Sequence, residues 1–163
     1  MSGLTHQRAK EMFSYNPITG LFTRLIGGSG CGNRVGSIAG SKNGHGYIHI
    51  QINKKFFKAH RLAWFYMTGE WPKDQIDHKD GVRDNNAWGN LREADNRLNH
   101  ENLRKANSTN KLGVMGVYKQ HRKFVARIKS NGKKIHLGMF DTAEAAHAAY
   151  LSAKRKIHAG CMI

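Results

Sequence analysis

The stretch IDHKDGVRDNNAWGNL, residues 76–91, places an aspartate next to a histidine and then carries asparagine and glycine where a core element would carry leucine. Asparagine and aspartate side chains hydrogen-bond to nearby backbone groups, which favours turns over regular structure. Asn85 and Asn86 are therefore expected to shape a turn. The stretch predicts a polar loop that follows an acid and an imidazole, Asp77 and His78.

Asp77 and His78 can supply two of the functions that phosphodiester hydrolysis requires. The reaction needs a base that deprotonates water and a cation that neutralises charge on the phosphate and on the leaving oxygen. If the pair lies on a strand, its two side chains point to opposite faces, so that one reaches a metal ion while the other reaches water. An ordinary imidazole is neutral enough at cytoplasmic pH to accept a proton. The alternative interpretation of an Asp-His pair is the cap of a turn.

The segment before this stretch, residues 1–72, predicts a small β-rich segment with a helix that packs on the residues that follow it. Apolar and polar residues alternate in GYIHIQI as they do in a half-buried strand, and the sequence INKKFF is typical of a hairpin turn. Gly69 is a natural helix stop. The expected elements are a short polar helix at residues 5–13, strands at 21–25, 46–52 and 54–60, and a buried helix at 60–69.

Two further segments lead to the C-terminal part of the chain. Residues 73–103 contain the polar stretch and then READNRLNHENLR, a helix candidate with Asp95 as its natural N-cap. Residues 104–113, RKANSTNKLG, lack apolar periodicity and predict a basic linker. A domain boundary is therefore expected there.

Residues 114–163 predict a second domain, a three-stranded antiparallel sheet packed on one helix. Lys123–Lys129 and Lys134–Met139 alternate apolar with mostly basic residues, and Asn131-Gly132 between them is a strong hairpin signal. In this pattern Ile135, Leu137 and Met139 share the apolar face. The sequence DTAEAAHAAYLSAKRKIHAG has the apolar rhythm of a helix. The predicted fold class of the whole chain is α+β.

The net charge indicates a polyanionic partner. The 163 residues include 27 Lys and Arg against 11 Asp and Glu, a formal net charge of +16. From Arg104 onward the net charge is +11, with 13 basic residues against 2 acids. Positive charge gains affinity for nucleic acid by releasing counterions from the phosphates, so double-stranded DNA is the expected partner.

Membrane and cysteine chemistry are disfavoured. No apolar run approaches the ~20 residues of a spanning helix, and the N-terminus lacks the apolar region of a signal peptide. Cys31 and Cys161 form no CxxC pair, which argues against a disulfide framework and against a cysteine-based zinc site. A cytoplasmic protein without a small-molecule cofactor is expected, and any metal would use oxygen and imidazole ligands.

Three short motifs, DHKDG, NNAWGNL and NRLNHEN, stand in order and close together. With them the sequence resembles the HNH endonuclease family, in the branch of phage and intron-associated homing endonucleases. The resemblance implies a ββα-metal fold in which His78 is the general base and Asp77 a metal ligand. It also implies that the Asn90 amide braces the loop that aims His78. His60 on the preceding helix is interpreted either as a core histidine or as a residue that packs near this site.

The last motif position falls on Asn99, which the resemblance implies as the second metal ligand. Asn96 and Asn102 lie three residues to either side and can share its helix face, so the choice among the three stays open. One divalent ion is expected, Mg²⁺ with Mn²⁺ as a substitute, because carboxylate and amide oxygens suit such a hard cation. Arg92 and Arg97 are interpreted either as phosphate contacts or as part of a solvated face.

The segment from GVMGVY to LSAKRKI resembles the AP2 DNA-binding domain, in its GVY opening, its FVARI strand, its GKKIHLGMFDT hairpin and its EAAHAAY helix. Where many AP2 domains carry tryptophan, this chain has Tyr118 and Phe124. The resemblance implies that the sheet lies against the major groove of DNA. The residues expected to contact DNA are basic and predicted to point outward: Lys119, Arg122, Lys123, Arg127, Lys129, Lys134 and His136.

The resulting hypothesis is a site-specific DNA endonuclease of the homing type, encoded by a phage or similar mobile element and working in the host cytoplasm. The AP2-like module supplies affinity and site choice, and the linker raises the DNA concentration at the nuclease. A monomer is expected to nick one strand, and a dimer or two events are needed to cut both. The alternatives are a non-catalytic DNA-binding regulator and, third, an RNA-binding protein.

Overall fold

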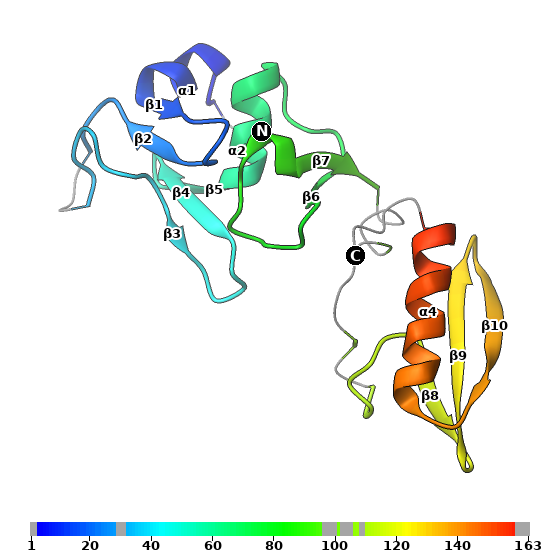
Figure 1. The fold of residues 1–163 in the computed structure, drawn as a ribbon. Coiled ribbons are helices and arrows are strands. Elements are labelled where there is room, and N and C mark those ends of the chain that lie inside the picture. The colour runs from blue at the N-terminus through cyan, green and yellow to red at the C-terminus, as the bar shows by residue number, and fades with distance from the viewer. Residues whose placement is uncertain (1–2, 29–31, 96–100, 102–105, 108–109, 159–163) are drawn as a thin grey trace. The chain divides into compact units, whose positions relative to one another are not determined.

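The computed structural model describes residues 3–28, 32–95, 101, 106–107 and 110–158. They fall into two compact units, Met1–Ala94 and Asp95–Ile163, and each unit is described by itself (Figure 1). The predicted linker, residues 104–113, lies within the second unit and partly outside the described residues. The predicted domain boundaries stay predictions.

The first unit consists of short antiparallel strands around helix α2. Its elements are α1 (His6–Met12), β1 (Phe13–Tyr15), β2 (Phe22–Arg24), β3 (Ser41–Lys42), β4 (Ile48–Ile52), β5 (Lys55–Lys58), α2 (Ala59–Thr68), β6 (Gln75–His78), the 3-10 helix η1 (Trp88–Asn90) and β7 (Leu91–Ala94). The strands form a β1-β2 hairpin, a β3-β4-β5 sheet and a β6-β7 hairpin. The α2 helix packs against α1, β4 and β5.

Local signals account for several of these boundaries. Helix α2 ends at Gly69, which has φ 83° and donates its N–H to the Phe65 carbonyl, as the sequence predicts. The β4-β5 hairpin turns through Asn53 and Lys54, whose φ values are 49° and 63°. Both values suit the two-residue turn that matches strand twist. At the other end of the unit, Thr5 caps α1 by accepting a hydrogen bond from the Arg8 N–H.

One hydrophobic core joins the N-terminal elements to the β6-β7 hairpin. Phe13 and Phe22 from the first hairpin are fully buried, and the same cluster includes Ile76 from β6 and Leu91 from β7. Phe13 and Phe22 contact edge to face, with ring centroids 6.0 Å apart. Residues 73–94 therefore share one core with the segment that precedes them.

The second unit contains a three-stranded antiparallel sheet in the order β10-β9-β8 and a helix that packs on it (Figure 1). Its elements are β8 (Val117–Gln120), β9 (Lys123–Ser130), β10 (Lys133–Phe140) and α4 (Ala143–Ile157). The β9-β10 turn uses Asn131 and Gly132 with φ values of 49° and 78°, the geometry that the Asn-Gly signal predicts. The assignment of this unit to AP2 domains stays a prediction.

The predicted apolar face of β10 is wrong at Met139, because the strand contains a bulge. The register shifts between His136 and Gly138, so Met139 pairs with Val125 instead of sharing a face with Ile135. Met139 is 53% exposed and lies on the face that carries Arg127. The extra residue of a bulge reverses the alternation of all side chains that follow it, which a strictly alternating pattern does not anticipate.

Within the described residues, no helix is long and apolar enough to cross a membrane.

Candidate functional site

Asp77 and His78 are the last two residues of strand β6, directly before the polar loop. Their register in the hairpin pairs Asp77 with Arg92 and His78 with Leu91 of β7. Both side chains are buried, with 7% and 4% of their surface exposed. Neighbouring strand residues point to opposite faces, so the carboxylate and the imidazole leave the hairpin on different sides.

Asn86 orients the His78 ring. The Asn86 Oδ1 atom lies 3.2 Å from His78 Nε2, and both residues are buried. The Asn86 Nδ2 group donates to the Asp84 carbonyl at 3.2 Å, which fixes the amide with its oxygen toward the ring. His78 Nε2 is therefore the donor, and in the neutral ring the lone pair belongs to Nδ1.

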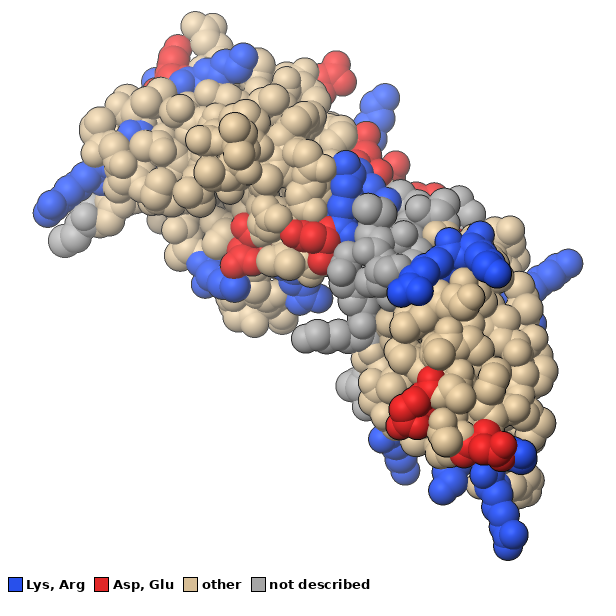
Figure 2. All heavy atoms as spheres, viewed as in Figure 1, with Lys and Arg blue, Asp and Glu red and all other residues tan. Residues whose placement is uncertain are grey.

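The environment of His78 favours the neutral imidazole. Burial lowers its pKa below the ordinary value, and the Asn86 hydrogen bond and the nearby carboxylates of Asp80, Asp77 and Asp84 offset only part of this effect. Acidic side chains gather at the loop after β6, with Lys and Arg side chains beside them (Figure 2). A neutral ring at physiological pH has the proton state of a general base.

A second histidine, His60, packs on the first. It lies near the start of α2, and its ring meets the His78 ring edge to face with centroids 5.0 Å apart. Burial, with help from His78, Lys58 and Arg61, lowers the pKa of His60 to about 3. The His60 Nδ1 atom is buried without a hydrogen-bond partner among the described residues. His60 thus lies beside the site as a neutral ring, which leaves both interpretations of it open.

Tyr47 borders the two histidines and is flanked by two cations. Its ring centroid lies 5.3 Å from that of His60 and 6.1 Å from that of His78. The Lys58 Nζ atom and the Arg83 guanidinium carbon each lie 5.2 Å from the Tyr47 centroid. Lys58 and Arg83 are exposed, so positive charge is available to solvent beside the site.

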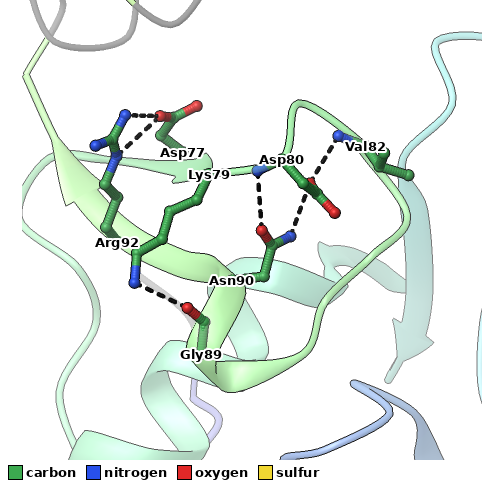
Figure 3. A network of polar contacts seen from close by, with 7 residues as sticks. All are labelled: Asp77, Lys79, Asp80, Val82, Gly89, Asn90 and Arg92. Atoms are coloured by element: carbon green, nitrogen blue, oxygen red, sulfur yellow. Dashed lines mark hydrogen bonds and ion pairs between the residues drawn. The ribbon is translucent and has the colours of Figure 1, made fainter. Parts of the chain in front are cut away.

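Arg92 holds the Asp77 carboxylate. Its Nε and Nη2 atoms donate to Asp77 Oδ2 at 3.1 and 2.8 Å (Figure 3). Figure 3 shows the second carboxylate oxygen of Asp77 pointing away from Arg92. Arg92 lies in strand β7, so the helix candidate READNRLNHENLR does not begin before Asp95. From the sequence, Arg92 was interpreted either as a phosphate contact or as part of a solvated face. The structure instead shows it in an ion pair with Asp77.

Asn90 ties the two ends of the polar loop together. Its Oδ1 accepts from the Asp80 N–H at 3.0 Å, and its Nδ2 donates to Asp80 Oδ1 at 2.9 Å (Figure 3). The same Nδ2 also donates to the Asn85 carbonyl at 2.8 Å. Burial raises the pKa of Asp80, but hydrogen bonds from Val82, Asn85 and Asn90 together outweigh burial and lower it. An ionised Asp80 is thus the acceptor around which the loop closes.

The predicted second metal ligand cannot be placed in the structure. Asn99, with its alternatives Asn96 and Asn102, lies outside the described residues. Among the described residues, no cluster of three or more His, Cys, Asp or Glu side chains forms a metal site.

The predicted DNA-binding residues of the second unit do not all share one face. Strand pairing places these residues on one face: Lys123, Arg127, Lys129, Lys134 and His136. Lys119 pairs with Phe124 and lies on the opposite face, which corrects its predicted position. Arg122 lies in the β8-β9 turn.

From the sequence, Asn86 was expected only to shape a turn, and Tyr47 was not predicted to lie near the site. Asn86 reaches His78 across the loop, and Tyr47 lies in the connection between β3 and β4. The first contact depends on how the polar loop folds back, and the second on how segments far apart in the chain pack, so no short sequence pattern marks either.

Comparisons with known proteins gave one family match and one similar solved structure. The family model described as HNH endonuclease matches residues 57–101. No curated protein matches the chain. One similar solved structure is "DNA binding and cleavage by the HNH homing endonuclease I-HmuI", with 19% identity, 98% of this chain and 95% of that chain covered, and a TM-score of 0.47. The residues that match the HNH endonuclease family, 57–101, thus include β6, the polar loop and β7.

Proposed function

We propose that the protein is a DNA endonuclease of the homing type that hydrolyses a phosphodiester with His78 as general base. The observation that carries the proposal is the buried His78 ring, whose Nε2 is held by Asn86 and whose Nδ1 has the lone pair. The HNH match over residues 57–101 supports the same chemistry.

The reaction follows from this tautomer. Water attacks the scissile phosphorus and forms a new P–O bond, while His78 Nδ1 takes its proton. The bond from phosphorus to the 3′ oxygen breaks, and that oxygen leaves with the electron pair and is protonated by solvent. Asn90 contributes by closing the loop that begins next to His78, and Asn86 by fixing the ring.

The Asp77 carboxylate, which precedes His78 in the sequence, is a suitable ligand for one divalent ion, Mg²⁺ with Mn²⁺ as a substitute. The Asp77 carboxylate presents one oxygen away from Arg92, and hard cations prefer such oxygen ligands (Figure 3). Asn99 is the proposed second ligand, with Asn96 and Asn102 as alternatives. When bound, the ion neutralises charge on the phosphate and on the leaving 3′ oxygen.

Double-stranded DNA is the proposed substrate. The basic face of the second unit supplies affinity and site choice in the manner of an AP2-like domain, with Arg127 and Lys134 among its cations. Lys58 and Arg83, beside Tyr47 and close to His78, contact the phosphates next to the scissile bond. A monomer nicks one strand, since the described residues form one such site.

The Arg92–Asp77 ion pair favours a second candidate function, a non-catalytic DNA-binding regulator. In that case the guanidinium, with 18% of its surface exposed, takes the place of a metal ion at the carboxylate, and the hairpin serves only as a scaffold.

Plasmid conversion tests the proposal. Supercoiled plasmid that carries DNA from the source genome is incubated with Mg²⁺ or Mn²⁺, with EDTA, and with the His78→Ala variant. We expect nicked product that requires the metal and is lost with EDTA and in the variant. Tight DNA binding with intact plasmid under both metals would instead favour the regulator.

A further inference from the structure

The turn between β1 and β2 lies against the back of the polar loop. Trp88 donates its N–H to the Pro17 carbonyl at 2.9 Å, and the Tyr15 hydroxyl donates to the Asn86 carbonyl at 2.7 Å. The second bond is buried and joins residues 71 positions apart in the sequence. These two hydrogen bonds fix the loop backbone on both sides of Ala87.

Gly20 allows this close approach. Its φ is 74°, and a Cβ atom there would lie 2.2 Å from the Asn86 carbonyl carbon and 2.3 Å from the Ala87 nitrogen. Both are backbone atoms, which cannot swing aside as the end of a side chain can. The turn itself is held by Asn16, whose Oδ1 accepts from the N–H groups of Ile18 and Thr19 at 2.9 and 3.1 Å. The turn is therefore a preformed surface shaped to fit residues 86–88.

Asn86 connects this surface to His78. Its carbonyl is bound by Tyr15, and its side-chain oxygen lies 3.2 Å from His78 Nε2. A displacement of the Asn86 backbone moves the amide that orients the ring. We propose that the β1-β2 hairpin, residues 13–24, is a positioning element for His78, with Tyr15 and Gly20 as positioning residues. The proposal rests on the proposed function of His78, and it assigns the N-terminal segment a part in catalysis.

The competing explanation is that Tyr15 only fills the core. Its ring does contact Phe22 and Tyr66, with centroid separations of 4.7 and 5.8 Å. Tyr15→Phe keeps these ring contacts and removes the hydroxyl, so it separates packing from positioning. A packing role predicts an unchanged cleavage rate, and a positioning role predicts a slower one.

The test compares three full-length variants, Tyr15→Phe, Gly20→Ala and the control Gly36→Ala. Gly36 has φ 82°, close to that of Gly20, but no atom lies within 4 Å of its added Cβ. The control therefore has similar backbone strain without the collision. We expect Tyr15→Phe to lower kcat by about tenfold, with the DNA Kd changed less than twofold, Gly20→Ala to lower kcat further, and Gly36→Ala to keep the wild-type kcat.

A second readout does not depend on cleavage. Ring ¹⁵N chemical shifts of His78, identified by their absence from the His78→Ala spectrum, report its tautomer and orientation. Tyr15→Phe and Gly20→Ala should shift these signals and Gly36→Ala should not; unchanged signals in Tyr15→Phe would overturn the proposal even if Gly20→Ala failed to fold. If the wild type cuts no DNA while Tyr15→Phe still shifts the ring signals, the nuclease function fails and the positioning of His78 stands.

Discussion

The Asn86 amide oxygen lies 3.2 Å from His78 Nε2, so the polar loop folds back onto the last residue of the strand from which it starts. A buried ring without such a partner can rotate or change tautomer, and the nitrogen that we propose as the proton acceptor then changes its position. The contact explains why an asparagine in a turn matters to a histidine eight residues earlier.

Replacement of Asn86 by alanine should therefore impair catalysis more than binding. We expect Asn86→Ala to lower kcat by up to about 100-fold, because a small misplacement of a reacting group is enough for such a loss. The free energy of unfolding should fall by about 1–3 kcal/mol as a buried donor loses its acceptor. Plasmid cleavage and urea unfolding measure the two effects, with Asn53→Gly in the exposed β4-β5 turn as the control. A wild-type rate in Asn86→Ala would contradict this role.

The Asp77–Arg92 pair allows catalysis and stability to be separated. Asp77→Asn leaves a largely buried guanidinium without its carboxylate, so we expect both cleavage and stability to fall, the latter by about 3 kcal/mol. Adding Arg92→Leu should restore stability but not cleavage, because the leucine removes the stranded charge and supplies no metal ligand. Urea unfolding and plasmid nicking of both variants decide this. Recovery of cleavage in the double variant would remove Asp77 from the metal site.

His60 should make the fold sensitive to acid. Its pKa is lowered to about 3 in the folded state, whereas an unfolded histidine titrates near 6.5. The unfolded chain thus binds the extra proton first, and stability is lost as pH falls below about 6.5. We expect His60 to contribute a loss of about 2 kcal/mol between pH 7 and pH 5, so that His60→Leu loses less stability than the wild type by this amount, while the contribution of His78 remains. Urea unfolding at both pH values measures it, and His45→Leu, at an exposed turn, should keep the wild-type dependence.

The two cations beside Tyr47 should act through phosphate. Lys58→Gln and Arg83→Gln are each expected to weaken DNA binding and to reduce the slope of log K against log salt by about 0.9. Lys55→Gln is the matched control, because Lys55 lies on the same strand but on its opposite face. Fluorescence anisotropy with labelled duplex over a salt series gives the slopes. Equal slopes for all three variants would place the DNA elsewhere.

The two faces of the sheet in the second unit should differ in their contribution to DNA affinity. Arg127→Gln and Lys134→Gln should lower DNA affinity several-fold, because these residues lie on the basic face of the sheet. Lys119→Gln should have a smaller effect, since strand pairing places Lys119 on the opposite face. Electrophoretic mobility shifts with the full-length variants measure the affinities. A dominant effect of Lys119 would show that DNA lies on the face that α4 covers.

Local chemistry made much of the fold predictable. The helix stop at Gly69 and the Asn131-Gly132 turn depend on the backbone conformations that those residues favour, and the structure has both. The placement of Asp77 and His78 on a strand before a polar loop was also accessible from the sequence. In each case a few consecutive residues contain the whole signal.

Contacts between distant segments were not predictable in this way. The bond from Tyr15 to Asn86 and the packing of His60 on His78 join elements that are far apart in the chain. The β10 bulge was missed because an apolar residue fits either face of an exposed strand, and Met139 is such a residue. The sequence thus predicted Asp77 and His78 as reacting groups, and the structure shows the contacts that hold the His78 ring.

The shared core of the first unit determines which residues must be transferred together if the proposed nuclease site is moved into another protein. The matched family segment begins at residue 57, yet Phe13 and Phe22 fill the same interior as Ile76 and Leu91. Excised at the family boundary, the β6-β7 hairpin would expose Ile76 and Leu91 to water and lose the β1-β2 turn that lies against its loop. A chimaeric protein that is to keep the proposed nuclease site therefore has to include the residues before position 57 together with the whole matched segment, residues 57–101.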